Sequence, residues 1–457
     1  MASTDQSLQS KRVVVMGLGN FGGGASVTRW LCDQNAVVTL TDGQSEAQLA
    51  NALSKIQGLP VRLVLGSHPL SLLDDCDLLV VNPAVDKSKS DFVAAAVNRN
   101  IPITTEINLF LQRCPATVAG ITGSTGKSTT TAMIHLALSA VMDRTGKGKC
   151  WLGGNIGRSL LPDLPAIRDG DIVVLELSSF MLEDTPRIRY SPHVAVVTNL
   201  VGNHLDRHGD IDAYARAKQN IIRFQTAADF AVLNGEDSRV ASWCSLTPAQ
   251  CRHYSAAGKA TVDLRVPGLH NQSNAQAAME VIRSLGFESE MPTAIEALRT
   301  FRGLPHRLEL VRQIAPPSGR QIQWFNDSKA TTPESAVTAL QAFDRGRLIC
   351  IVGGYDKHAD MTEFTRQLAM QCDGILGIGA TGPELVRQVL STTPDLHERC
   401  MVAGTLENAM RIAHDWLRSR PNVTTILLSP GCASWGQFTN YEQRGRLFSE
   451  LANAAVF

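Results

Sequence analysis

Eight consecutive residues in the middle of the chain have the composition of a loop that binds phosphate. Thr122–Thr129 reads TGSTGKST and follows the apolar segment Thr117–Ile121. In such a loop, glycines let backbone N–H groups close around phosphate oxygens, and the N-terminus of the next helix adds partial positive charge. Lys127 provides a cation for the β- and γ-phosphates, and Ser128 a hydroxyl for magnesium. The spacing differs from G-x-x-x-x-G-K-[ST] because Gly120 is one residue too early, so an ordinary turn is the alternative.

Three later side chains could complete a site for phosphoryl transfer. Glu176 ends the apolar segment IVVLE, where an acid near a phosphate loop can hold magnesium, although it could also be an ordinary carboxylate at a strand end. His204 lies in a loop beyond the predicted strand Val194–Thr198, at the end of the sheet where ligands bind in open α/β folds. Lys218 lies in a helical segment and, taken alone, is expected to be a solvated surface lysine.

A second glycine-rich turn lies near the start of the chain. Gly17, Gly19 and Gly22 follow an apolar segment in a G-x-G-x-x-G-like pattern, and Asp42 ends the next predicted strand. This arrangement fits a dinucleotide, with the acid on a ribose, but it equally fits one nucleoside diphosphate. The glycines could also serve only to tighten a turn between a strand and a helix.

The elements that position these residues alternate between strands and helices, which predicts parallel sheets and an α/β fold. A boundary is expected near residue 113, before Pro115, and Phe301–Pro305 has the composition of a hinge linker. These features predict three domains, at 1–113, 114–303 and 304–457. The strands that we expect are Val13–Met16, Val37–Leu40, Asp77–Val81, Thr117–Ile121, Ile172–Leu175, Val194–Thr198, Leu348–Val352, Gly374–Ile378 and Thr425–Leu428.

Composition excludes several classes of partner. Lys and Arg number 43 against 43 Asp and Glu, so the chain has no electrostatic footprint for nucleic acid or an anionic membrane. No window approaches the roughly 18 apolar residues of a membrane span, and the polar N-terminus predicts no signal peptide. The ten cysteines form no C-x-x-C pair, which predicts reduced thiols. We therefore expect a cytoplasmic protein with small-molecule partners, no nucleic acid and no membrane insertion.

Seven segments, in order along nearly the whole chain, resemble motifs of the Mur ligase family, the ATP-dependent amide ligases of bacterial cell-wall synthesis. They are TGSTGKST, GGNIG at 153–157, ELSSF at 176–180, HLDRH at 204–208, the helix with Ala217-Lys218, HNQSNA at 270–275 and GLPHRLE at 303–309. Further on, NDSKAT at 326–331 and LLSPGCAS at 427–434 resemble the family member that adds D-glutamate. Three positions depart from the family pattern: Thr125 replaces asparagine, Asn203 replaces aspartate, and Trp435-Gly436 replaces a pair that usually ends in aspartate.

The resemblance implies a fold and a reaction. The fold would be a Rossmann-like N-terminal domain that binds a UDP-linked substrate, a central P-loop ATPase-like domain with a parallel sheet, and a Rossmann-like C-terminal domain that binds an amino acid. The reaction would join D-glutamate to UDP-N-acetylmuramoyl-L-alanine through an acyl phosphate in cytoplasmic peptidoglycan precursor synthesis. ATP and two Mg²⁺ ions would be required, and we expect a monomer.

The resemblance also implies roles for individual residues. Catalysis would depend on Lys127, Glu176, His204 and Lys218, and the lysine matching Lys218 is carbamylated in the family. The metal ions would be held by Ser128, Glu176, His204 and Lys218. ATP would contact Gly123, Ser124, Thr125, Gly126, Lys127, Ser128, Thr129, Asn274, Arg307 and Asp327. The UDP-linked substrate would contact Gly19, Asn20, Phe21, Asp42, Asn82, Pro83, Ala84 and Asn155. The acceptor amino acid would contact Lys329, Thr331, Lys357, Ser434 and Tyr441.

Other functions remain as alternatives. The first is another amino-acid-adding ligase of the same family with a different acceptor. A folylpolyglutamate synthase lacks the UDP-binding domain that residues 17–42 suggest. An NAD-dependent oxidoreductase would explain the first glycine turn but not TGSTGKST, and a nucleotide-binding regulator would use the phosphate loop without catalysis.

Overall fold

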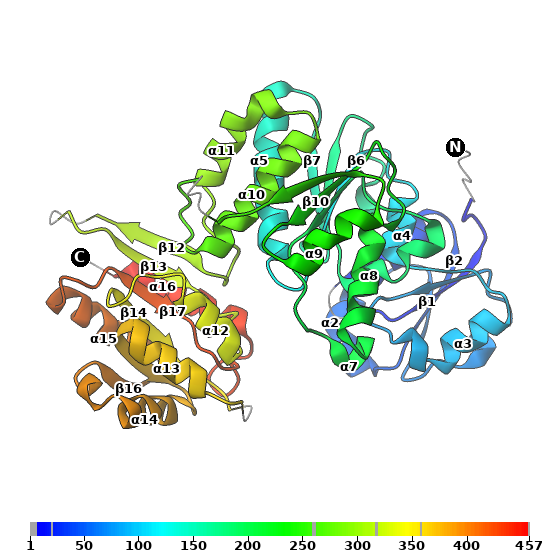
Figure 1. Cartoon of the computed structure of the whole chain (residues 1–457). Helices are drawn as coiled ribbons and strands as arrows, with labels where there is room; N and C mark the ends of the chain where they lie inside the picture. Colours follow the sequence, from blue (N-terminus) through cyan, green and yellow to red (C-terminus); the bar gives the residue numbers. More distant parts are fainter. Residues whose placement is uncertain (1–6, 20–21, 258–261, 316–318, 357–358, 456–457) are drawn as a thin grey trace. The chain divides into compact units, whose positions relative to one another are not determined.

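Three separate sheets organise the chain, each with helices packed against it (Figure 1). The computed structural model describes all residues except 1–6, 20–21, 258–261, 316–318, 357–358 and 456–457, and it leaves out the side chain of Leu205. The chain divides into two units, and each is described by itself. Unit 1 comprises residues 1–257 and 274–295, and unit 2 comprises residues 258–273 and 296–457.

The first sheet of unit 1 has the strand order β3-β2-β1-β4-β5, and every pair in it is parallel. The order places β1 at the centre, as in a Rossmann fold, with the first glycine turn at its carboxyl end. The elements are β1 (Arg12–Met16), α1 (Gly23–Asp33), β2 (Val37–Asp42), α2 (Glu46–Leu53), β3 (Val61–Leu65), β4 (Leu78–Val81), α3 (Asp91–Asn98), β5 (Ile103–Thr104) and α4 (Glu106–Leu111).

The second sheet of unit 1 is also parallel throughout, in the order β11-β10-β9-β6-β8-β7. All five residues of β8 are buried, as expected for a parallel strand covered on both faces. The elements are β6 (Thr117–Thr122), α5 (Lys127–Thr145), β7 (Cys150–Gly154), β8 (Ile172–Glu176), α6 (Ser179–Leu182), β9 (Val194–Val197), α7 (Leu205–His208), α8 (Ile211–Arg223), β10 (Phe230–Asn234), α9 (Ser238–Ser242) and β11 (Gln250–Tyr254). Two helices are divided between the units: α10 (Leu269–Ser284), of which residues 274–284 belong to unit 1, and α11 (Met291–Arg299), of which residues 291–295 do.

The sheet of unit 2 has the order β12-β13-β17-β14-β15-β16, with only β12 antiparallel to its neighbour. Side chains of β14 alternate between two cores, because Leu348 and Cys350 pack on one face while Ile349 and Ile351 pack on the other. The elements are β12 (Glu309–Ile314), β13 (Ile322–Asn326), α12 (Pro333–Leu340), β14 (Leu348–Val352), α13 (Thr362–Gln371), β15 (Cys372–Ile378), α14 (Gly382–Thr392), β16 (Cys400–Gly404), α15 (Leu406–Ser419), β17 (Thr425–Leu428) and α16 (Tyr441–Ala454).

The predicted α/β fold with three parallel-sheet domains is confirmed, and each predicted strand corresponds to an observed one. The exact boundaries at residues 113 and 303 remain predictions. The prediction that all cysteines are unpaired is wrong for one pair. Cys244 and Cys251 form a disulfide with their Cα atoms 5.8 Å apart, because the chain turns back between Trp243 and β11.

Candidate functional site

The predicted phosphate loop connects the end of β6 to the start of α5. Gly123 and Gly126 adopt φ values of 145° and 78°, which side-chain-bearing residues rarely adopt. A Cβ atom on Gly123 would overlap the hydroxyl of Thr198, so the strand end of β9 approaches the loop closely. Gly126 directly precedes Lys127 and is the N-cap of α5, so the amino end of a 19-residue helix opens onto the loop.

Hydrogen bonds to the segment after β9 fix the shape of the loop. The Thr125 amide and hydroxyl both donate to Asn199 Oδ1, at 2.9 and 3.2 Å, and Asn199 Nδ2 donates back to the Thr125 carbonyl. The Thr198 hydroxyl donates to the same carbonyl at 2.7 Å. Ser124 donates through its hydroxyl to the Val201 carbonyl at 2.8 Å. Threonine at position 125 is therefore accommodated through Asn199.

Two lysines converge on one carbonyl of this loop. Lys127 Nζ donates to the carbonyls of Gly123 and Ser124, both at 2.9 Å. Lys218 Nζ donates to the Gly123 carbonyl at 2.7 Å and lies 4.3 Å from the centre of the Tyr214 ring. Lys218 is only 1% exposed, so the expectation of a solvated lysine from position alone is wrong. Burial, helped by the charge of Lys127, lowers the pKa of Lys218 to about 7 despite the opposing effect of Glu176.

Helix α8 explains why Lys218 points inward. Asp210 caps its N-terminus by accepting a hydrogen bond from the Ala213 amide at 2.7 Å. Tyr214, Ala217 and Lys218 share its buried face with Ile221 and Ile222, at the spacing expected for one side of a helix. The burial of Lys218 is thus the result of its place in the helical repeat.

Glu176 ends β8 beside the loop, and its carboxylate is buried. Oε1 accepts a hydrogen bond from Asn155 Nδ2 at 2.9 Å, whereas Oε2 has no hydrogen-bond partner within the described part of the chain. Asn155 is itself fixed by its amide, which donates to the Glu176 carbonyl at 2.8 Å. A buried carboxylate oxygen without a partner is unfavourable. It is the kind of atom that a bound cation would satisfy.

His204 precedes α7 in a loop with φ of 53°, a left-handed conformation uncommon for residues other than glycine. Its ring lies 5.1 Å from that of Phe180, which stacks on His208 at 5.3 Å. Burial lowers the pKa of His204, and the ammonium groups of Lys127 and Lys218 act in the same direction. The imidazole is therefore favoured in its neutral form, with a nitrogen lone pair available.

The same loop is connected to the N-terminal sheet. The Arg207 guanidinium donates to the carbonyls of Pro83, Ala84 and Val85 at 3.3, 3.1 and 2.7 Å, and its plane lies 4.6 Å from the Phe180 ring. The structure therefore places the predicted substrate residues after β4 next to the His204 loop.

At the first glycine turn, Asp42 binds the backbone. Its Oδ2 accepts hydrogen bonds from the amides of Leu18 and Gly19 at 2.8 and 3.4 Å. Asn82 Nδ2 donates to the Gly17 carbonyl at 3.3 Å. The predicted substrate residues Gly19, Asp42 and Asn82 are thus grouped at the carboxyl ends of β1, β2 and β4. Asn20 and Phe21, predicted for the same site, lie outside the described residues.

The residues predicted to contact the nucleotide lie in both units. In unit 1, the Thr130 hydroxyl on α5 donates to Asn274 Oδ1 on α10 at 2.9 Å, which ties Asn274 to the helix after the phosphate loop. In unit 2, Asp327 follows β13 and accepts hydrogen bonds from the Leu308 amide and the Ser429 hydroxyl at 3.2 and 2.9 Å. Burial raises the pKa of Asp327 to about 7. Arg307 is exposed.

The predicted acceptor residues of unit 2 lie after β13 and β17 and at the start of α16. Lys329 Nζ lies 5.4 Å from the centre of the Tyr441 ring. Thr331 is half-buried and Ser434 is 4% exposed. Lys357 lies outside the described residues. These positions follow the carboxyl ends of parallel strands, where ligands bind in open α/β sheets.

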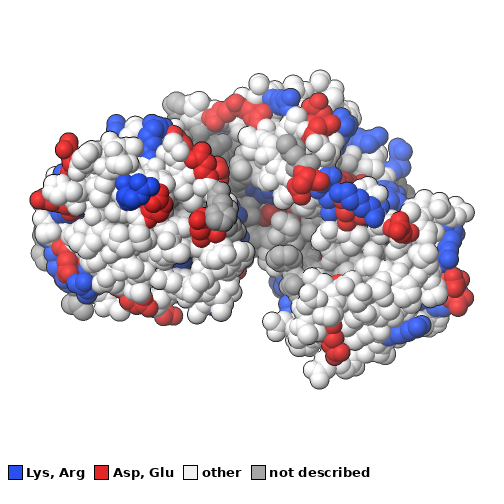
Figure 2. Space-filling model, turned by 90° about the horizontal axis from the view of Figure 1, so that it is seen from below, with Lys and Arg blue, Asp and Glu red and all other residues white. Residues whose placement is uncertain are grey.

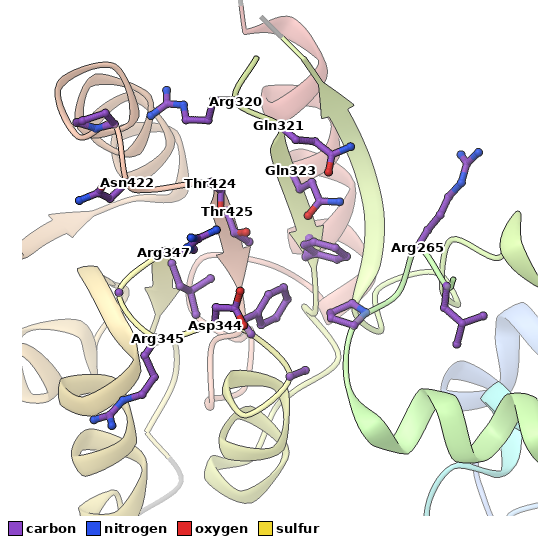
Figure 3. Close-up of a pocket in the computed structure, with 18 residues that line it drawn as sticks. Arg265, Arg320, Gln321, Gln323, Asp344, Arg345, Arg347, Asn422, Thr424 and Thr425 are labelled. Carbon is purple, nitrogen blue, oxygen red and sulfur yellow. The ribbon is translucent and has the colours of Figure 1, made fainter. Parts of the chain in front are cut away.

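A cavity of about 840 Å³ in unit 2 lies at the amino ends of β13, β17 and β14, opposite the carboxyl ends that the acceptor residues follow (Figure 3). Arg320, Arg347 and Thr425 are among the residues that line it. Arg320 donates to the carbonyls of Arg420 and Leu417 at 2.9 and 2.8 Å and so closes the C-terminus of α15. The cavity does not include the predicted acceptor residues.

The structure tests whether the donor set fits magnesium. In the described residues, no three His, Cys, Asp or Glu side chains gather in a way that could hold a metal ion. The predicted set is different, since it combines Ser128 in the first turn of α5 with the partnerless Glu176 Oε2, His204 and a modified Lys218. Oxygen-rich sites with few protein ligands are typical of Mg²⁺ bound together with phosphates. Among the described residues, the unpartnered Glu176 Oε2 is the observation that fits the ion, and the rest of the ligand set stays a prediction.

Sequence reasoning missed several residues that shape the site. Asn199, Thr198 and Arg207 hold the loops, and only the neighbouring positions of β6, β9 and β4 reveal their contacts. Tyr214 could have been found from its i, i+4 spacing to Lys218. Arg444 on α16 is fully buried, although its segment EQRGR suggests an exposed helix face.

Surface features agree with the composition. On the face shown in Figure 2, Lys and Arg side chains lie among Asp and Glu side chains. Within the ranges that the structure covers, no helix has both the length and the apolar character needed to cross a membrane.

A phosphate loop, a strand-end acid and a buried lysine on three α/β domains define a nucleotide-dependent enzyme of the P-loop type. Comparison with known proteins is more specific. The family model described as the Mur ligase middle domain matches residues 121–282, the MurD-like N-terminal domain matches 11–105, and the glutamate ligase domain matches 306–432. The chain belongs to the Mur ligase family.

Relatives of known name cover almost the entire chain. A UDP-N-acetylmuramoylalanine--D-glutamate ligase from Roseiflexus sp. (strain RS-1) is 33% identical over 98% of this chain and 99% of its own. The protein of the same name from Geotalea uraniireducens (strain Rf4) is 34% identical over 98% of each chain.

Solved structures share the fold at lower identity. The UDP-N-acetylmuramate-alanine ligase MurC from Thermotoga maritima has a TM-score of 0.57 at 22% identity, covering 97% of this chain and 99% of its own. A MurF ligase from Thermotoga maritima, solved in complex with ADP, has a TM-score of 0.53 at 16% identity, covering 99% and 98%.

Proposed function

We propose that this chain is the ligase that joins D-glutamate to UDP-N-acetylmuramoyl-L-alanine with hydrolysis of ATP to ADP and phosphate, in cytoplasmic synthesis of a peptidoglycan precursor. The observation that carries the proposal is the grouping of Lys127, Lys218 and Glu176 around one phosphate loop. The full-length similarity to named D-glutamate ligases and the segment NDSKAT at 326–331 support the choice of acceptor.

The reaction has to overcome a poor leaving group. A carboxylate cannot be attacked productively by an amine because oxide would have to leave, so the γ-phosphoryl group of ATP is first transferred to the carboxylate of the alanine residue. The amine of D-glutamate then adds to the acyl phosphate, and the tetrahedral intermediate expels phosphate and forms the amide. The first step brings two anions together, so stabilising charge in place before the reaction is the main task of the site.

Residues of unit 1 would supply that charge. Lys127, the amides of residues 123–126 and the amino end of α5 would bind the phosphates of ATP. Thr129 follows in the first turn of α5, and Asn274 would contact the nucleotide beside Thr130. His204 would contribute as a ligand of the ion near the reacting carboxylate.

Magnesium fits this donor set. Ser128 and Glu176 would hold one ion, and Glu176, His204 and Lys218 a second. When bound, Mg²⁺ would reduce the repulsion between the γ-phosphate and the substrate carboxylate. Lys218 would serve as an oxygen ligand only after carbamylation, because an ammonium group has no lone pair. The low pKa of Lys218 supports this modification, since carbon dioxide reacts with the neutral amine.

The two substrates would bind at carboxyl ends of parallel strands. Gly19, Asn20, Phe21 and Asp42 would hold the uridine, Asn82-Pro83-Ala84 the diphosphate, and Asn155 the muramoyl group. In unit 2, Arg307 and Asp327 would contact the nucleotide. The acceptor residues would be Lys329, Thr331, Lys357, Ser434 and Tyr441. We further propose that the protein acts as a monomer.

The decisive experiment measures phosphate release with ATP, Mg²⁺ and UDP-N-acetylmuramoyl-L-alanine against a panel of D- and L-amino acids. We expect turnover with D-glutamate and a mass increase of the UDP product by one glutamyl residue. Preference for L-alanine, a diamino acid or a dipeptide would identify a different amino-acid-adding ligase. Nucleotide binding without phosphate release under any of these conditions would contradict an enzymatic role.

A further inference from the structure

Arg444 is a fully buried cation in unit 2 that the proposed chemistry does not use. It lies on α16 with no exposed surface. Its Nε donates to the Ser328 hydroxyl at 3.0 Å, and its Nη2 donates to the carbonyls of Ser328 and Cys432 at 2.9 and 3.1 Å. Its Nη1 is buried and has no hydrogen-bond acceptor among the residues that the structure describes.

The guanidinium lies where three loops meet. Ser328 follows β13, Cys432 follows β17, and Gly354 follows β14. Gly354 lies so close to the guanidinium that a Cβ atom added to it would be 3.1 Å from Arg444 Nη1. The loops after β14 and β17 are also joined directly, since the Tyr355 amide donates to the Ala433 carbonyl at 2.8 Å. Arg444 therefore joins the loops after β13 and β17 by hydrogen bonds and lies against the loop after β14, which the Tyr355–Ala433 hydrogen bond connects to the loop after β17.

Each of these loops carries a residue proposed to bind the acceptor. Lys329 directly follows Ser328, Ser434 is two residues beyond Cys432, and Lys357 is three residues beyond Gly354. A change in the contacts of Arg444 would therefore shift Lys329 and Ser434 together. The phosphate loop belongs to unit 1, so its own hydrogen bonds do not depend on Arg444.

The charge of Arg444 is not neutralised by an ion pair. Its hydrogen-bond acceptors are a hydroxyl and two carbonyls, and we find no carboxylate paired with it in the described part of unit 2. The carboxyl group of Asp327, which interacts with it electrostatically, is instead held by Leu308 and Ser429. Burial lowers the pKa of Arg444 to about 10, so it remains a cation at neutral pH. Buried charges are normally paired, and an unpaired one favours an anionic ligand nearby.

We propose that Arg444 is the positioning residue for the acceptor, holding the three loops in register and providing the positive potential that favours an amino acid with a second carboxylate. This proposal rests on the proposed function and specifies how its acceptor is chosen. Arg444 does not contact the acceptor. It acts through the loops that carry Lys329 and Ser434.

The test compares Arg444→Gln and Arg444→Lys with the wild-type enzyme. Lysine keeps the charge but loses the planar fork that holds two carbonyls, whereas glutamine loses the charge. We expect Arg444→Gln to raise the KM for D-glutamate about tenfold or more while the KM for the UDP-linked substrate stays within about twofold, because the residues proposed for that substrate all lie in unit 1 and a buried charge acts most strongly on nearby groups. Arg444→Lys should raise the KM for D-glutamate, relative to the KM for the UDP-linked substrate, by a smaller factor.

A matched control separates positioning from simple loss of stability. Arg320→Gln also removes an arginine that donates to two carbonyls, but at the opposite edge of the sheet. It should lower the melting temperature and leave the KM for D-glutamate unchanged. If Arg444→Gln does not fold, the test uses Arg444→Lys instead, and the measured quantity is its KM for D-glutamate relative to its KM for the UDP-linked substrate.

Two failures can be told apart. Wild-type enzyme that releases no phosphate with D-glutamate would overturn the proposed function, whatever the variants do. Wild-type enzyme that uses D-glutamate, together with folded Arg444 variants whose KM for D-glutamate is unchanged relative to that for the UDP-linked substrate, would overturn the role of Arg444 alone.

Discussion

Replacing Lys218 by alanine tests the least expected part of the site. Burial and the charge of Lys127 lower the pKa of Lys218 to about 7. At neutral pH about half of such side chains are neutral amines, compared with roughly one in 2,500 for an ordinary lysine of pKa near 10.4. The neutral amine needed for carbamylation is therefore favoured by about three orders of magnitude. We expect Lys218→Ala to lose on the order of a hundredfold or more in activity, as removal of groups around a metal typically does.

The structure also offers a simpler role for Lys218, and the assay must separate the two. Its ammonium donates to the Gly123 carbonyl at 2.7 Å, and because Lys127 remains as a second donor to that carbonyl, loss of the Lys218 hydrogen bond costs about 0.5–1.5 kcal/mol of stability. Acetate or formate supplies a carboxylate and cannot donate to a carbonyl, whereas methylammonium can. If the modified lysine binds the ion, acetate or formate should partly restore phosphate release by Lys218→Ala, and methylammonium should not.

Two further measurements complete this test. Removal of dissolved carbon dioxide should lower the activity of the wild-type enzyme, and bicarbonate should restore it. Arg216→Ala on the exposed side of the same helix serves as the control and should leave activity unchanged. Rescue by methylammonium alone, or a fully active Lys218→Ala enzyme, would refute carbamylation.

Three other changes have outcomes that follow from the contacts. Lys127→Ala should abolish phosphate release, at a cost of several kcal/mol of barrier, while calorimetry shows unchanged binding of the UDP-linked substrate; near-normal turnover would exclude its role. Gly123→Ala should lower the free energy of unfolding by about 1–3 kcal/mol in urea titrations and weaken the binding of ATP, because the added methyl group would overlap Thr198. An unchanged free energy of unfolding would contradict the close approach of Thr198 to the loop. Burial lowers the pKa of His414 to about 4, and the charges of Arg418 and Arg312 act in the same direction; its Nε2 accepts a hydrogen bond from buried Trp324 at 3.1 Å. The stability that this neutral ring confers is complete above pH 6.5 and lost as pH falls toward 4, by about 1 kcal/mol after screening, and His414→Gln should remove that dependence in urea titrations across this range.

The sequence was sufficient to predict those elements whose residues follow one another in the chain. The apolar strand Thr117–Ile121 followed by TGSTGKST was sufficient for the phosphate loop, because strand, glycines and helix start are consecutive. β12 was not predicted, since an antiparallel edge strand depends on pairing with β13. β7 was not predicted either, because its sequence CWLGG ends in two glycines, which are uncommon in strands.

The site shows the same division between local and distant information. Glu176 and His204 were singled out because acids and histidines at strand ends have a recognisable chemistry, and their roles stay predictions. The burial of Lys218 could have been inferred from its helical repeat with Tyr214 and Ile221. The burial of Arg444 could not have been inferred in this way. Its contacts are with Ser328 and Cys432, in the loops after β13 and β17, and only the order of the strands in the sheet brings these loops to it.

The contact between Thr125 and Asn199 has a consequence for evolution. The amide and hydroxyl of Thr125 share one oxygen of Asn199, and the Asn199 side chain returns a hydrogen bond to the Thr125 carbonyl. A substitution at either position therefore removes hydrogen bonds from the other, although they are separated by 74 positions in the chain. A mutation at one exposes the other to compensating change. Lineages that carry a different residue at position 125 are expected to have drifted at position 199 as well, and a family consensus for either position alone describes half of the constraint.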